Sequence, residues 1–200
     1  AVADGAGNSY ITPFALVLNA TNFHIGLLSS LSGLFSPIAQ FYGSKLMEKH
    51  SSKKIVLRFV LFQAFMWLTI AILAILFWKG IFADYLPYAL IILYTILAAL
   101  WGFAYPSWFS WMGDLVPENE RGKYFSRRNR AIGAVGLIAF LAAGLLLDNF
   151  KTKGLVLLGF SILFVLAFGF RFISYNFFRR QYCPRLRLNK GYYFSIIDFL

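Results

Sequence analysis

The chain has 200 residues, of which 60% are hydrophobic and only 14% are charged, and its formal net charge is +11. A soluble domain carries about 25% charged residues, and a domain of this size has too small an interior to hide so much apolar surface. The composition therefore excludes an ordinary soluble domain. Because the bases fall between apolar runs, it favours the lipid bilayer over nucleic acid as the partner.

Six stretches of the chain are long enough to cross a bilayer, since a spanning helix needs about 20 apolar residues. They lie at about residues 1–20, 25–47, 55–78, 86–112, 131–147 and 155–178. The stretches do not alternate in hydropathy, which indicates helices and not the strands of a barrel. The sequence therefore predicts an all-α membrane protein with a six-transmembrane-helix bundle over residues 1–180.

The first stretch contains Asp4, the only acid inside a predicted span. Asn8 follows four residues later on the same helical face, and Tyr10 lies close by, while glycines and a proline should loosen this helix. A carboxylate in the bilayer is costly, so it usually faces a cavity or a partner. Asp4, Asn8 and Tyr10 are therefore candidates for binding substrate or coupling protons. The alternative is that Asp4 lies near the cytoplasmic end and is hydrated.

Small residues mark the second and fifth stretches and predict close helix contacts. The second contains Gly26, Ser29, Ser30, Ser32, Gly33, Ser36, Ala39 and Gly43. The fifth has Gly136, Ala139 and Ala143 on one face. Gln40 and Gln63 are expected to form hydrogen bonds between helices.

Aromatic residues recur at helical spacing in the fourth stretch, at Trp101, Tyr105, Trp108 and Trp111. We interpret them as an aromatic belt at the inner interface, with a stacking wall for a flat or sugar-like substrate as the alternative. Arg171 lies about two turns before Arg179, and we expect its side chain to snorkel to the cytoplasmic surface.

The distribution of Lys and Arg predicts the orientation. The segments after the second, fourth and sixth spans each have five bases in or beside them, whereas the three other turns have none, one and two. Because basic loops stay on the cytoplasmic side, both termini are expected in the cytoplasm.

Catalytic and metal-binding chemistry are not expected. The single Cys183 excludes an internal disulfide and a cysteine-based metal cluster. No predicted span contains His or Cys, so a nucleophile paired with a base has no candidates there. The sequence thus predicts neither an enzyme nor a bound metal or cofactor.

Two cytoplasmic segments resemble the motifs of the major facilitator superfamily. The stretch "GSKLMEKHSSKKIVL" is similar to the signature G-x-L-x-D-R-x-G-R-K-x-x-L, with Glu48, Lys49 and Lys53 in the places of its Asp, first Arg and Lys. It departs from the signature at Ser51 and Ser52. The closer match is "DLVPENERGKYF", which resembles the D-L-x-P-x-x-x-R-G-x-x-F turn of prokaryotic members.

The resemblance covers the whole chain but only half of a family member. It implies an N-terminal six-helix half with a 3+3 inverted repeat, the start of a cytoplasmic linker at 181–200, and a missing C-terminal six-helix half. The expected function is then secondary active transport of a small solute by alternating access, in a prokaryotic cell membrane. A non-transporting scaffold or a half-size dimeric membrane protein is the alternative.

The resemblance also implies a cytoplasmic gate formed by paired acids and bases. The expected pairs join Asp114 with Lys49 or Lys53, and Arg121 with Glu48. Such pairs would brace the outward-facing state.

Overall fold

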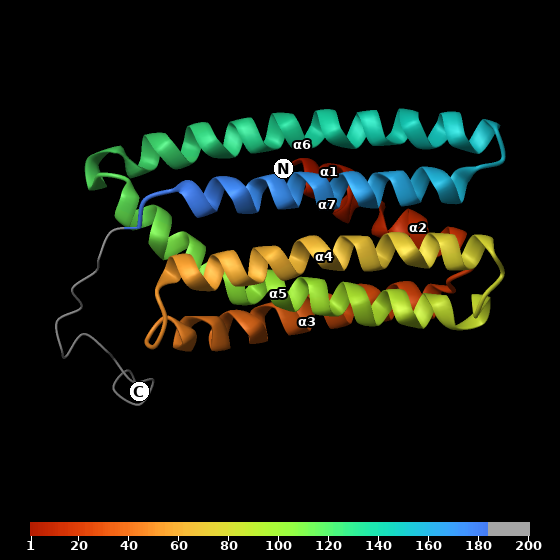
Figure 1. Cartoon of the computed structure of the whole chain (residues 1–200), viewed down its shortest axis with the longest axis horizontal. Coiled ribbons are helices and arrows are strands. Elements are labelled where there is room, and N and C mark those ends of the chain that lie inside the picture. The colour runs from red at the N-terminus through yellow and green to blue at the C-terminus, as the bar shows by residue number, and fades with distance from the viewer. Residues whose placement is uncertain (184–200) are drawn as a thin grey trace.

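The computed structural model describes residues 1–183, and within this range it contains helices and no strands. The long helices lie side by side along the longest axis of the molecule (Figure 1). They are α3 (Asn22–Leu46), α4 (Ser52–Trp78), α5 (Leu86–Leu115), α6 (Arg121–Thr152) and α7 (Val156–Arg180). Short 3₁₀ turns, η2 (Ala83–Tyr85) and η3 (Glu118–Glu120), precede α5 and α6. Among the described residues, α4, α5 with η2, α6 with η3, and α7 are long and apolar enough to cross a membrane.

The first expected span is broken into three pieces. These are α1 (Val2–Ala6), the 3₁₀ turn η1 (Asn8–Tyr10) and α2 (Ile11–Val17). Pro13 lacks a backbone N–H, which is tolerated in the first turn of α2 because the N–H groups there have no partner inside the helix. The expected loosening of this helix is therefore confirmed, and it places the break beside Asn8.

Helix α6 begins at Arg121, well before the apolar span expected at 131–147. The chain turns at Pro117, whose backbone is extended, and the acids Glu118 and Glu120 then start the new helix at its positive end. The bases that follow are consequently the first turns of a helix and not a loop.

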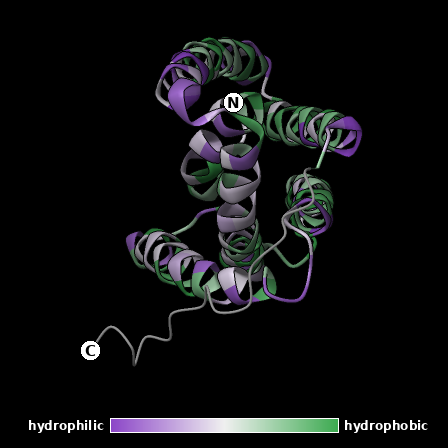
Figure 2. Ribbon diagram, turned by 90° about the vertical axis from the view of Figure 1, so that its left-hand side faces the viewer, coloured by the Kyte–Doolittle hydropathy of each residue, from purple (hydrophilic) through white to green (hydrophobic). Residues whose placement is uncertain are grey.

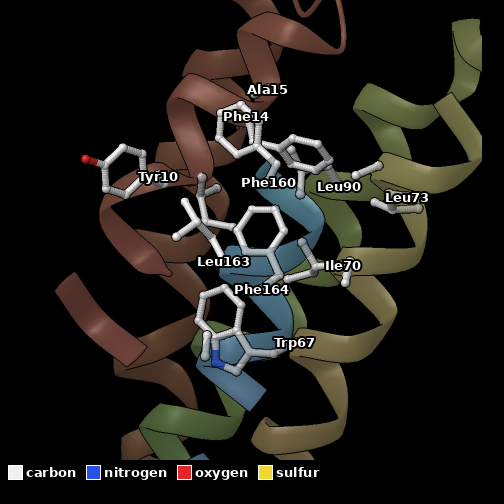
Figure 3. Close-up of a cluster of buried hydrophobic side chains, with 14 of the residues drawn as sticks. Tyr10, Phe14, Ala15, Trp67, Ile70, Leu73, Leu90, Phe160, Leu163 and Phe164 are labelled. Atoms are coloured by element: carbon white, nitrogen blue, oxygen red, sulfur yellow. The ribbon is translucent and has the colours of Figure 1, made fainter. Parts of the chain in front are cut away.

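The helices pack in three main groups: α3 lies on α5, α4 contacts both α5 and α7, and α1 contacts α6 and α7. Figure 2 looks along the helices and shows hydrophobic residues on every long one. Where α2, α4 and α7 meet, aromatic rings form the centre of the core (Figure 3). Phe14 and Phe164 meet edge to face with centroids 5.0 Å apart, and Trp67 stacks on Phe164 at 5.8 Å.

Glycines permit the closest helix contacts. A Cβ atom at Gly43 would lie 2.7 Å from the Phe103 carbonyl oxygen, and one at Gly102 would meet the carbonyl oxygen of Ser36. A Cβ at Gly5 in α1 would likewise meet the carbonyl oxygen of Gly136 in α6. The expected close contacts thus occur at Gly43 and Gly136. They do not occur at Gly26 or Gly33, which have no neighbouring atom within 4 Å of an added Cβ.

Candidate functional site

A cavity of about 290 Å³ lies where α1, α4, α5 and α7 meet. Its polar lining residues come from six different elements, and its apolar lining includes Trp67 and Trp101. The polar residues are Asp4, Asn8, Ser36, Gln63, Tyr94 and Arg171. Convergent polar groups in an otherwise apolar cavity are typical of a small-molecule site.

Arg171 is held in this cavity by Gln63. Both Nε and Nη2 of Arg171 donate to Oε1 of Gln63. The amide Nε2 of Gln63 donates in turn to the Leu100 carbonyl oxygen at 3.0 Å, and the Gln63 side chain is only 1% exposed. Because a guanidinium has only donors, the amide oxygen is the atom of Gln63 that can face Arg171. Helices α4, α5 and α7 are thereby joined through one polar network.

The expectation that Arg171 snorkels to the cytoplasmic surface is wrong. Its guanidinium lies 5.1 Å from the centroid of the Trp101 ring and lines the cavity. Gln63, in contrast, forms the interhelical hydrogen bonds that were expected of it.

A second cavity of about 360 Å³ shares Asp4, Trp101 and Arg171 with the first and extends along α5 and α6. Besides Trp101, its walls include five aromatic residues: Tyr105, Trp108, Phe109, Phe125 and Phe178. The guanidinium of Arg128 also lines it and lies 4.1 Å from the centroid of the Trp108 ring.

This arrangement changes the interpretation of the aromatic residues of α5. Trp101, Tyr105 and Trp108 line the second cavity, and Trp111 is 1% exposed in the core. The placement favours the stacking-wall alternative for the first three. Trp111 does not belong to an aromatic belt, because a belt residue must reach the membrane surface.

Asp4 and Asn8 meet as expected of two residues on one helical face. Asn8 Nδ2 donates to Asp4 Oδ1 at 3.0 Å, and both residues line the first cavity. Tyr10 lies elsewhere: its hydroxyl donates to the Phe140 carbonyl oxygen of α6 at 2.8 Å. Figure 3 shows this hydroxyl directed away from the aromatic core. The structure therefore brings together two of the three residues predicted for this site.

The residues of the predicted cytoplasmic gate form other contacts. Arg121 Nε donates to the Gly113 carbonyl oxygen at 3.0 Å, which ties the start of α6 to the end of α5. Lys53 Nζ donates to the Gln181 carbonyl oxygen. Within residues 1–183 the single ion pair joins the Ala1 amino group to Asp4, so neither Asp114 with Lys49 or Lys53 nor Arg121 with Glu48 is paired in this structure. The gating role of these residues stays a prediction.

Among residues 1–183 no three His, Cys, Asp or Glu side chains lie together in a group that could hold a metal. The chemistry of the two cavities is that of charged, hydrogen-bonding and aromatic side chains.

A family model described as Major Facilitator Superfamily matches residues 1–182. No curated protein and no solved structure matches the chain.

Proposed function

The chain belongs to the major facilitator superfamily, and we propose on this basis that it moves a small solute by secondary active transport with alternating access. Members of this family are membrane transporters and not enzymes. The helices that are apolar enough to cross a membrane agree with an integral membrane protein. The solute would bind in the two cavities, which share Asp4, Trp101 and Arg171.

The observation that carries this proposal is the convergence of Asp4, Asn8, Gln63 and Arg171 on one cavity. Charged residues at membrane depth are costly, and they mark substrate or ion pathways when they face a cavity. Asp4 is the candidate for proton or substrate coupling, supported by Asn8.

The helix packing supports a 3+3 inverted repeat, in which the first span, α3 and α4 correspond to α5, α6 and α7. Under this exchange the contact of α3 with α5 becomes that of α6 with α1, and the contact of α4 with α5 becomes that of α7 with α1. Close glycine contacts occur in both members of the first pair. The chain would then be one six-helix half, and a second half would complete the cavity.

Transport by the full-length protein tests the function. Reconstituted in proteoliposomes with a metabolite mixture, the protein should accumulate or exchange at least one small solute above the level of protein-free liposomes. Folded protein that moves no solute under imposed proton or sodium gradients would contradict the proposal and favour a membrane scaffold.

Cysteine labelling tests the proposed orientation, with both termini in the cytoplasm of a prokaryotic cell. The turns before α4 and α6 lie at one end of the bundle, and those after them at the other (Figure 1). In a background with Cys183→Ser, a cysteine at exposed Asp84 or Thr152 should react with an impermeant maleimide added outside intact cells. One at Ser51 or Asn119 should react only after the cells are opened, and the reverse pattern would contradict the orientation.

A further inference from the structure

Two arginines reach the second cavity from different helices, and each lies over a tryptophan of α5. Arg171 of α7 lies over Trp101, and Arg128 of α6 lies over Trp108. The two tryptophans are seven residues apart, which is two helical turns and about 10 Å along the axis. The guanidiniums therefore follow one face of α5 and line one continuous cavity.

Neither guanidinium forms an ion pair with a carboxylate within residues 1–183, although Asp4 lines the same cavity and acts electrostatically on Arg171. Gln63 accepts from Nε and Nη2 of Arg171, and Asn129 accepts from Nη1 of Arg128. Amide acceptors orient a guanidinium but leave its charge in place. Arg171 also keeps N–H groups that Gln63 does not use, because a guanidinium carries five.

The charge balance of the second cavity is positive. Its lining contains two arginines and one acid, Asp4. The remaining wall includes six aromatic side chains, Trp101, Tyr105, Trp108, Phe109, Phe125 and Phe178, which suit a flat apolar group. Guanidinium groups bind carboxylates and phosphates through two parallel hydrogen bonds. These charge-assisted hydrogen bonds are stronger than hydrogen bonds from neutral donors.

We propose that the solute is a small organic anion with a planar apolar body, and that Arg171 binds its anionic group. Gln63 is a positioning residue that fixes the plane of the guanidinium. Arg128 supplies a second cationic position along the same wall. The proposal rests on the transport function proposed above, and it adds the chemical class of the solute.

A charge series with one ring shape tests the proposal on the wild-type protein. Benzoate, benzamide and benzamidine are nearly isosteric, and they are anionic, neutral and cationic at neutral pH. We expect saturable binding of benzoate to the purified full-length protein, measured by calorimetry and by tryptophan fluorescence. Benzamide should bind at least about tenfold more weakly and benzamidine more weakly still. Absence of benzoate binding up to millimolar concentration, or equal binding of all three, would overturn the proposal.

Variants then assign the anionic position. Arg171→Gln should weaken benzoate binding at least about tenfold and abolish the preference over benzamide, while Arg171→Lys should retain part of both. Arg180→Gln is the matched control, because it removes the same charge from an exposed position on the same helix. Binding to a folded Arg171→Gln variant at the wild-type level would overturn the assignment.

Transport separates this proposal from the one on which it rests. Uptake of solutes without any preference for anions would contradict the proposal that the solute is an anion, and it would still support the transport function. Benzoate binding without transport of any solute would support the anion site and contradict the transport function.

Discussion

Replacing Gly102 by alanine should lower the midpoint of thermal unfolding of the detergent-solubilised protein, by an amount equivalent to about 1–3 kcal/mol. Gly102 is buried where α5 crosses α3. A Cβ there would meet the Ser36 carbonyl oxygen and would lie 2.9 Å from the Cβ of Ala39. Neither atom belongs to a flexible side-chain end, so the helices would have to separate. Close backbone approach is a main source of helix association in lipid.

Gly33→Ala is the matched control, since it makes the same substitution in α3, the partner helix. No atom lies within 4 Å of a Cβ at Gly33, and the residue is exposed. The stability of the Gly33→Ala variant should be unchanged or raised, because alanine in a helix is more favourable than glycine by about 1 kcal/mol. Equal effects of the two substitutions would contradict the close packing of α3 on α5.

Hydropathy alone predicts some of the helices well. Long apolar runs marked α4, α5 and α7 to within a few residues, because lipid-facing and core-facing sides are both apolar in such a protein. The start of α6 was harder to predict, since its first turns are polar and carry no hydropathy signal. The signal that does predict it is Pro117 followed by Glu118 and Glu120, a helix-start pattern, and the structure confirms the start there.

The candidate site was only partly predictable. Asp4 stands out in the sequence because an acid inside an apolar run is rare, and Asn8 lies on the same helical face. The spacing between Arg171 and Arg179 does not reveal the cavity, because it fits a side chain that snorkels to the surface as well as one that lines a cavity. The partner of Arg171, Gln63, is 108 residues away in the sequence, and no local pattern reports a contact between α4 and α7. The available signal was that each is an isolated polar residue within an apolar helix.

Asp4→Asn should abolish transport by the full-length protein while expression and thermal stability stay close to those of the wild type. Asn is nearly isosteric with Asp, and its amide oxygen can still accept the hydrogen bond from Asn8 Nδ2, which is 3.0 Å long in this structure. The substitution therefore keeps the contact with Asn8, removes the ion pair with the Ala1 amino group, and removes the negative charge and the titratable proton. Counterflow in proteoliposomes over a range of pH measures the loss.

The control is Asp84→Asn, which makes the same change at an exposed acid in η2, outside both cavities. It should transport at the wild-type rate. If Asp4 couples a proton to transport, any residual activity of Asp4→Asn should also lose its dependence on the proton gradient, a change that a purely structural role would not produce. Wild-type transport by Asp4→Asn with an unchanged pH profile would instead identify Asp4 as a hydrated acid at the edge of the cavity. Arg171 and Arg128 would then be the charged cavity residues that select the solute.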